Sequence, residues 1–298
     1  MDLFEFDLDP PLILASGILD QTAGTMERIA RKGVGGIVTK SIGKEPREGH
    51  PNPTVVELET GLLNAMGLPN PGIETFKNEL NKLQESVKQK PIIGSIFASN
   101  SDDFAELAKE MVEHGADMIE LNLSCPHAEG YGASIASDDE MMVEVIKVVK
   151  DSVEEPILTK LPPSNEIGRK AALAEKSGSD GIVCINTVRA MAINFETKEP
   201  ILGNKIGGYS GNGIKPIGLR CVFEVYKEVD IPIIGCGGMT TGRDALEYVL
   251  AGASALQFGT AFHSRGKKAP KKIADEMKEL MEKENINTLQ ELLGEAHS

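Results

Sequence analysis

The stretch EHGADMIELN (residues 113–122) has two counterparts further along the chain, EKSGSDGIVCIN (175–186) and LAGASALQFG (250–259). Each begins with the end of a helix-like pattern, passes through a glycine and a small residue, and ends in a short apolar run typical of a buried strand. Glycine allows the left-handed backbone with which many helices end. The three copies predict a chain built from repeating helix–strand units.

The same alternation extends over nearly the whole chain. Helix-like segments separate eight short strand-like runs, at residues 12–16, 36–40, 92–97, 118–123, 157–161, 181–186, 233–237 and 255–259. Eight alternations in about 250 residues are typical of a (β/α)8 TIM barrel. A doubly wound α/β sheet usually has fewer strands and a GxGxxG turn, which is absent after the first run. We therefore predict an α/β TIM barrel that forms a single domain over residues 1–298.

Two intervals between the predicted strand ends are unusually long. The gap from Val38 to Ser95 is 57 residues and that from Asn186 to Cys236 is 50, whereas the other gaps are 22 to 38 residues. These insertions follow strands 2 and 6 and leave from carboxyl ends of strands, where barrel enzymes place their active sites. Inserted loops longer than about 15 residues are usually functional or disordered. Because both insertions contain apolar anchors, we expect ordered lids or binding loops.

Composition and charge exclude several classes of function. The chain is 41% hydrophobic and only 4% aromatic, with 31 glycines, which suits α/β layers. Its net charge of −14 argues against a nucleic acid as the main partner, because phosphate backbones require clustered Lys and Arg. The first eleven residues have no basic signal-peptide segment, and no apolar run reaches the length of about 20 residues that a membrane span needs. We expect a cytoplasmic protein without membrane contact.

The four cysteines are Cys125, Cys184, Cys221 and Cys236. They form no CxxC pair and no metal-ligand spacing, so no metal site is predicted. Cys184 and Cys236 lie inside apolar runs, which indicates buried packing residues. Cys125 lies instead where a strand-like run meets a glycine-containing loop, and the following proline cannot continue the strand. Two interpretations of this thiol stay open, a small buried residue and a reactive group on a mobile loop.

Polar residues gather at the carboxyl ends of the predicted strands and in the first insertion. They are Ser16, Thr39–Lys40–Ser41, Asn122, Cys125, Lys160, Asn186–Thr187 and the segment Asn64–Ala65–Met66–Gly67–Leu68. Buried polar groups cost free energy unless they are partnered, and a ligand rich in amides and carbonyls would partner these. Singly each could be a strand-end cap; their convergence on one rim favours a ligand site.

Glycines follow the last two strands and recur in the second insertion. Gly237–Gly238, Gly259–Thr260 and the segment 207–211 (GGYSG) let backbone N–H groups approach a ligand, and Thr240 and Thr241 add hydroxyls. Barrels often hold phosphate with the loops after strands seven and eight. The alternative is a set of tight turns without a ligand. Together the loops favour a phosphorylated cofactor, and the roomy polar rim suggests one larger than a sugar phosphate.

Three of these polar residues fit the chemistry of a flavin dehydrogenase. Lys40 and Lys160 could take two roles between them. A cation near the pyrimidine end of a flavin stabilises its anionic reduced form, and another can pair with a ligand carboxylate. A thiol has a pKa of about 8.5 that neighbouring positive charge can bring towards neutrality, so Cys125 could act as a base.

Nine motifs in order resemble one known family. They are ASG (15–17), TKS (39–41), NAMGLPNPG (64–72), ELNLSCPH (120–127), TKL (159–161), INT (185–187), IGGYSGNGIKP (206–216), GCGGM (235–239) and LQFGTAF (256–262). Together they resemble dihydroorotate dehydrogenase of class 1, the cysteine class, and residues 201–220 look most like the class 1B catalytic subunit. The resemblance covers nearly the whole chain. It implies an FMN-binding TIM barrel that oxidises (S)-dihydroorotate to orotate in pyrimidine synthesis.

The resemblance also assigns residues. The family's catalytic base falls on Cys125, which would take the C5 proton of the substrate while the C6 hydride goes to flavin N5. Substrate contacts fall on Lys40, Asn64, Ala65, Met66, Gly67, Leu68, Asn122, Asn186 and Thr187. Cofactor contacts fall on Ser16, Lys40, Ser41, Ser95, Asn122, Lys160, Ile185, Gly211, Gly237, Gly238, Gly259 and Thr260.

The class 1B resemblance implies partners. That subunit forms a homodimer and passes electrons to a subunit with FAD and a 2Fe–2S cluster, and then to NAD⁺, whereas class 1A uses fumarate. Because the chain has no cysteine cluster for such a centre, the second subunit would be a separate protein.

The chain departs from the family pattern in three motifs. Where the family often has SCPN, His127 gives SCPH, a residue also found in the related dihydropyrimidine dehydrogenase barrel. Class 1B often has Asn in place of Ser95, and residues 160–164 read KLPPS instead of KLSPN. Two alternatives stay open, the reduction of uracil or thymine by a similar barrel and a non-enzymatic scaffold that binds flavin or phosphate. We leave His127 as loop packing or a loop-closing hydrogen bond.

Overall fold

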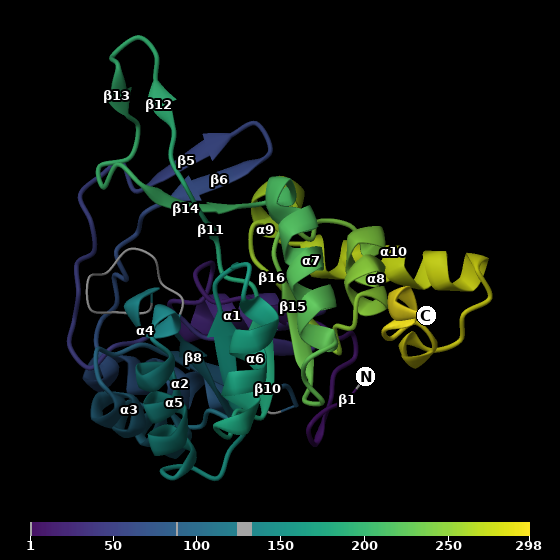
Figure 1. The fold of residues 1–298 in the computed structure, drawn as a ribbon, viewed down its shortest axis with the longest axis horizontal. Helices are drawn as coiled ribbons and strands as arrows, with labels where there is room; N and C mark the ends of the chain where they lie inside the picture. Colours follow the sequence, from purple (N-terminus) through teal and green to yellow (C-terminus); the bar gives the residue numbers. More distant parts are fainter. Residues whose placement is uncertain (1, 88, 124–132) are drawn as a thin grey trace.

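The structure is a computed structural model that describes residues 2–87, 89–123 and 133–298. Eight parallel strands close into a barrel in the order β10-β15-β16-β3-β4-β7-β8-β9 (Figure 1). Their bounds are β3 Leu12–Leu14, β4 Gly36–Val38, β7 Ile92–Ile96, β8 Met118–Asn122, β9 Ile157–Leu161, β10 Gly181–Cys184, β15 Ile233–Cys236 and β16 Ala255–Phe258. The predicted TIM barrel is confirmed, and each strand begins at the residue where the sequence placed its start.

Helices surround the barrel (Figure 1). The longer ones, one after each barrel strand, are α1 Ala23–Ala30, α2 Ile73–Ser86, α3 Ser101–Glu113, α5 Asp139–Lys150, α6 Ile167–Lys176, α7 Lys215–Tyr226, α8 Gly242–Leu250 and α10 Ala269–Lys283; α4 Ala133–Ser137 and α9 Ala261–Arg265 are short additional helices. Their apolar residues recur every three or four positions, as Phe76, Leu80 and Leu83 do in α2, so one face of each helix packs on the strands. This arrangement buries the outer surface of the barrel.

The interior of the barrel is apolar towards the amino ends of its strands. Inward-facing residues such as Ile93, Met118 and Leu158 form one buried cluster with Leu3 and Leu8. Leu3 belongs to a hairpin of β1 Asp2–Leu3 and β2 Phe6–Asp7, which pair antiparallel. The hairpin therefore closes one end of the barrel, and Figure 1 shows it opposite the long insertions.

The two long insertions pair with each other. The first contributes β5 Val55–Leu58 and β6 Gly61–Asn64, and the second contributes β11 Val188–Ala190 and β14 Gly207–Ser210, in one antiparallel sheet of order β11-β14-β6-β5. A small hairpin of β12 Ile193–Asn194 and β13 Glu199–Pro200 extends beyond it (Figure 1). The expected ordered loops are thus a single sheet over the mouth of the barrel, joined where Gly208 pairs with Asn64.

We predict that Gly207→Ala destabilises this sheet. A Cβ at residue 207 would collide with the Asn64 carbonyl oxygen and come within 2.6 Å of Leu202 Cδ1, so β14 would have to move away from β6. Overpacking of this kind costs about 1–3 kcal/mol of unfolding free energy, measurable by urea denaturation. The control is Gly24→Ala in α1, where a Cβ meets nothing within 4 Å, and we expect no loss there. Equal stability of the two variants would contradict the close approach.

Candidate active site

A cavity of about 360 Å³ opens at the carboxyl ends of the barrel strands, beneath the insertion sheet. Most of the residues that the sequence singled out line it, namely Ser16, Lys40, Ser41, Asn64, Met66, Gly67, Leu68, Asn122, Lys160, Ile185, Asn186, Thr187, Gly211, Gly237, Gly238, Gly259 and Thr260. Its volume falls within the range of small-molecule sites, about 300–1,000 Å³. The barrel rim and the sheet thus form one pocket.

Two of the predicted site residues do not line the cavity. Ala65 is fully buried in a small core of the insertion sheet with Leu63 and Leu202, and does not line the cavity. Ser95 is also fully buried and lies behind the lining, where it contacts other side chains of the site. Cys125 lies outside the described residues, as does the loop that carries His127.

The floor of the cavity is a polar layer within the barrel. Side chains two residues apart on a strand point the same way, so Glu120 faces inward above Met118, Lys160 above Leu158 and Gln257 above Ala255. Glu120 and Gln257 are 0% exposed and Lys160 is 4% exposed. The barrel interior therefore changes from apolar to charged one layer below the pocket.

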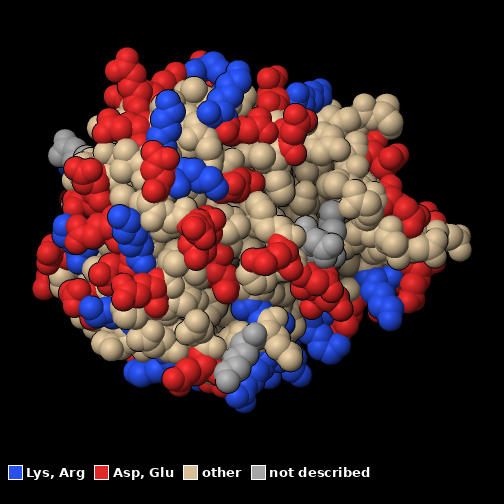
Figure 2. Space-filling model, turned by 90° about the horizontal axis from the view of Figure 1, so that it is seen from below, with Lys and Arg blue, Asp and Glu red and all other residues tan. Residues whose placement is uncertain are grey.

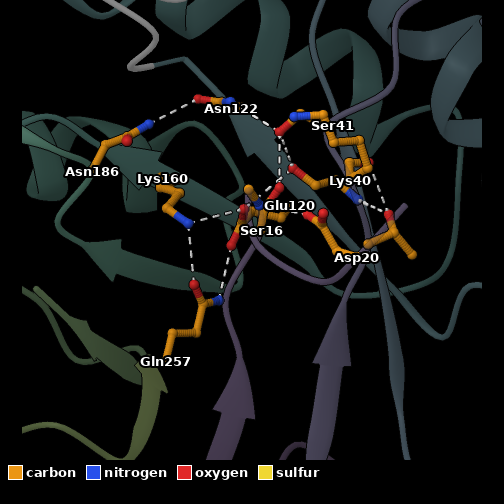
Figure 3. Close-up of polar contacts among 12 residues, drawn as sticks. Ser16, Asp20, Lys40, Ser41, Glu120, Asn122, Lys160, Asn186 and Gln257 are labelled. Atoms are coloured by element: carbon orange, nitrogen blue, oxygen red, sulfur yellow. Dashed lines mark hydrogen bonds and ion pairs between the residues drawn. The ribbon is translucent and has the colours of Figure 1, made fainter. Parts of the chain in front are cut away.

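Lys160, Glu120 and Gln257 contact one another in this layer (Figure 3). The Lys160 ammonium donates to Glu120 Oε1 at 3.3 Å and to Gln257 Oε1 at 3.1 Å, and Gln257 Nε2 donates to Glu120 Oε2 at 2.9 Å. Burial disfavours the charged form of a lysine, but the Glu120 carboxylate outweighs this, and the pKa of Lys160 is raised. The floor of the cavity thus holds a positive charge that is balanced from below.

Hydrogen bonds connect this floor to the rim. Ser95 Oγ donates to Glu120 Oε1 at 3.3 Å and shares a 2.9 Å hydrogen bond with Ser41 Oγ, which in turn accepts from Asn122 Nδ2 at 3.0 Å. Asn186 Nδ2 donates to Asn122 Oδ1 at 3.3 Å (Figure 3). Each amide is therefore held in one orientation by its neighbours, which prepares the pocket wall before a ligand binds.

Lys40 stands at the rim beside a buried acid that the sequence did not single out. Asp20 is 1% exposed, accepts from Gly17 N at 2.5 Å, and has a backbone carbonyl that accepts from Lys40 N at 3.2 Å. Burial raises the pKa of Asp20, and the positive charge of Lys40 offsets part of that rise. No hydrogen-bond acceptor for the Lys40 ammonium is found in residues 2–87, 89–123 and 133–298, so it is available to a ligand.

Glycines shape the opposite end of the cavity. Gly211, Gly237 and Gly238 have φ angles of +104°, +128° and +78°, and a Cβ at residue 238 would lie 2.5 Å from Lys215 N. Only glycine fits there without strain. Within the described part of the chain, the backbone N–H groups of Gly238 and Gly259 have no acceptor. Such orphaned donors at the mouth of a barrel suit a phosphate group.

Thr240 and Thr241 do not offer free hydroxyls, contrary to the expectation from sequence. Asp244 Oδ2 accepts from Thr240 N, Thr240 Oγ1 and Thr241 N at 2.9, 3.0 and 2.8 Å, and Thr241 Oγ1 caps α8 by accepting from Asp244 N. Lys215 pairs with the other oxygen of Asp244 at 2.7 Å. These residues fix the glycine loop from behind instead of facing a ligand.

The carboxylate of Asp244 should make stability depend on pH. Burial disfavours it, but Lys215 and the threonine donors outweigh that cost and lower its pKa to about 2. A carboxyl whose pKa is lower in the folded state stabilises the fold above its unfolded pKa of about 3.9, and that contribution of about 2 kcal/mol is lost as the pH falls towards 2. Urea denaturation should show Asp244→Asn less stable than wild type at neutral pH, with the difference shrinking below pH 4.

The matched control for this prediction is Asp275→Asn. Asp275 pairs with Lys271 on the surface of α10, with a side chain that is 56% exposed, and exposed ion pairs contribute little. We expect nearly wild-type stability of this variant at each pH. A constant difference between wild type and Asp244→Asn from neutral pH down to pH 2 would contradict the assignment.

Metal sites and membrane-spanning helices were also sought in residues 2–87, 89–123 and 133–298. In these residues no group of three or more His, Cys, Asp or Glu side chains is placed to hold a metal ion. None of the described helices combines the length and apolar character needed to cross a membrane. On the face shown in Figure 2, acidic and basic side chains are interspersed over the surface.

Comparison with known proteins identifies relatives over nearly the full length. The family model described as dihydroorotate dehydrogenase matches residues 1–281. A protein of Pyrococcus horikoshii named "Dihydroorotate dehydrogenase B (NAD(+)), catalytic subunit" is 51% identical over 98% of this chain and 95% of its own length. A protein of Methanocaldococcus jannaschii with the same name is 47% identical over 96% of this chain and 94% of its own length.

Proposed function

The chain belongs to the dihydroorotate dehydrogenase family, and on this premise we propose that it oxidises (S)-dihydroorotate to orotate with FMN in the cavity at the barrel mouth. The observation that carries the proposal is the convergence of two buried lysines, three asparagines and the orphaned glycine N–H groups on one pocket. This donor set suits a phosphorylated, carbonyl-rich cofactor together with an anionic substrate. The reaction would serve pyrimidine biosynthesis.

Different residues along the cavity would bind different parts of FMN. Gly237, Gly238, Gly259 and Thr260 would bind the FMN phosphate with backbone N–H groups. At the other end, Lys160 and the amide of Asn122 would hold the pyrimidine edge of the flavin ring, where the ammonium is anchored by Glu120 and the amide by Ser41. When bound, FMN supplies an acceptor for the hydride from C6 of the substrate.

The substrate would lie between the flavin and the insertion sheet. Asn64, at the end of β6, and the following residues to Leu68 enclose that side of the cavity, with Asn186 and Thr187 opposite. Lys40 would pair with the substrate carboxylate, because its ammonium is buried and available. We propose Cys125 as the base that takes the C5 proton, so that one proton and one hydride leave as the C5–C6 double bond forms.

The names of these relatives suggest partner proteins. Because these proteins are called catalytic subunits of an NAD(+) enzyme, we propose that electrons leave this chain through a separate subunit with FAD and a 2Fe–2S cluster, towards NAD⁺. We also propose a homodimer of this chain, with each copy a single domain, in the cytoplasm. To distinguish the two electron acceptors, the chain is purified with and without the separate FAD and 2Fe–2S subunit. Its flavin is reduced anaerobically, and NAD⁺ or fumarate is then added to see which one reoxidises it.

The test of the function is anaerobic reduction of the bound flavin. The purified protein should be yellow, release FMN on denaturation, and lose its visible flavin absorbance when dihydroorotate is added. A colourless protein that takes up no FMN would contradict the proposal. Bound FMN that neither dihydroorotate nor another dihydropyrimidine reduces would indicate a flavin-binding scaffold instead.

A further inference from the structure

Glu120 is a buried acid for which the proposed reaction has no direct use. It is 0% exposed, lies below the cavity and does not line it. A buried carboxylate costs several kcal/mol unless charges and hydrogen bonds compensate it. Its presence in the middle of β8, between Ile119 and Leu121, therefore calls for a physical reason.

Both oxygens of Glu120 are engaged. Oε1 accepts from Lys160 Nζ and from Ser95 Oγ, each at 3.3 Å, and Oε2 accepts from Gln257 Nε2 at 2.9 Å. Gln257 also accepts from Lys160 at 3.1 Å, so it bridges the acid and the base. The lysine ammonium has three protons, and Glu120 and Gln257 take two of them from below. No other acceptor for it is found in the described part of the chain, so the third remains for a ligand in the cavity that Lys160 lines.

Few other charges among the described residues reach Lys160. Cys236 at the end of β15 and Asp20 after β3 act on it from strands that do not adjoin β9, and Lys40 acts in turn on Asp20. Burial raises the pKa of Cys236, which therefore keeps its proton at neutral pH and supplies no negative charge. Burial also raises the pKa of Asp20, and its carboxylate adds less to Lys160 than Glu120 does. Glu120 is thus the main counter-charge of the lysine.

Resting on the proposed flavin site, we propose that Glu120 is a positioning residue that keeps the Lys160 ammonium charged and aimed into the cavity before a flavin bound there takes up electrons. A buried lysine without a counter-charge tends to lose its proton. Without Glu120, the proton would return only when negative charge arrives on the flavin. Glu120 would therefore determine the number of protons that the protein and flavin take up with the two electrons.

The test is the pH dependence of the flavin midpoint potential in wild type and in Glu120→Gln. One proton per two electrons gives a slope of about 30 mV per pH unit, and each further proton adds about 30 mV. We expect the one-proton slope in wild type above neutral pH and the two-proton slope in Glu120→Gln. Identical slopes in the two proteins would overturn the proposal, and so would a two-proton slope in wild type, which needs no variant to be measured.

Two further variants separate charge from packing. Gln257→Met removes the bridging hydrogen bonds but keeps the ion pair, so it should lose stability and keep the wild-type slope. Lys160→Met removes the group that titrates, so adding Glu120→Gln to it should leave its slope unchanged. A steeper slope in Gln257→Met would show that packing, not the carboxylate charge, controls proton uptake, and would overturn the proposal.

A second readout is independent of flavin binding. In the flavin-free protein labelled with ¹³C-lysine, NMR follows the Lys160 side chain with pH, and its signal is assigned by its loss in Lys160→Met. We expect Glu120→Gln to lower the proton affinity of Lys160 by about tenfold or more. An unchanged affinity overturns the role of Glu120 even if flavin binds, whereas a protein that takes up no flavin yet shows this loss would refute only the proposed function.

Discussion

Replacing Cys125 by serine is expected to slow the reduction of bound flavin by dihydroorotate about 10²–10⁴-fold at neutral pH, the usual contribution of a positioned general base. A thiol with a pKa of about 8.5 is a few per cent thiolate at pH 7, whereas a serine hydroxyl hardly ionises there. The residual rate of the serine variant should rise with pH, because a larger fraction of the serine hydroxyl is then ionised and can act as the base. Anaerobic stopped-flow measurement of flavin absorbance isolates this half-reaction from the later electron transfer.

The control is Cys221→Ala, which removes a buried thiol from α7. Burial raises the pKa of Cys221 to about 11, so it cannot serve as a base at neutral pH, and it does not line the cavity. We expect it to keep the wild-type reduction rate. If Cys125→Ser reduces its flavin nearly as fast as wild type, the base must be sought elsewhere on the rim.

The barrel could be predicted from sequence because its signals are local. Each strand is a short apolar run, and glycines such as Gly115, Gly178 and Gly252, all with positive φ, end the preceding helices. The insertion sheet gave no such signal, because its pairing joins Asn64 to Gly208, which are 144 residues apart. Loop length indicated that both insertions matter, but only the fold brings them together.

The residues that line the cavity were predictable from sequence, whereas the buried residues that contact them from outside the cavity were less so. Lys40, Asn122 and Lys160 stand at strand ends and line the pocket as expected. Glu120 and Gln257 carried a signal that could have been used, since polar residues inside buried strands require partners. Asp20 carried none, because a single acid in a loop is usually solvated.

The choice between dihydroorotate and an uncharged pyrimidine as substrate depends on Lys40. Lys40 is 7% exposed and lies at the cavity rim, shortly after β4. Within the described residues its ammonium has no hydrogen-bond acceptor. A substrate carboxylate would be its natural partner. Dihydroorotate carries one and the reduced forms of uracil and thymine do not, so replacing Lys40 should impair turnover of the first and leave turnover of the others largely unchanged.

Lys40→Met should therefore lower kcat/KM for dihydroorotate by about 30- to 5,000-fold, because removing one partner of a buried charge pair costs about 2–5 kcal/mol. Steady-state kinetics with dihydroorotate and with dihydrouracil, at equal flavin content, measure the difference. The control is Lys44→Met, whose side chain is 44% exposed and pairs with Asp103 on the surface, and we expect wild-type kinetics there. Equal losses for the charged and the uncharged substrate would place Lys40 with the flavin alone. No loss for dihydroorotate would mean that its carboxylate is bound elsewhere, and the case for an uncharged pyrimidine would strengthen accordingly.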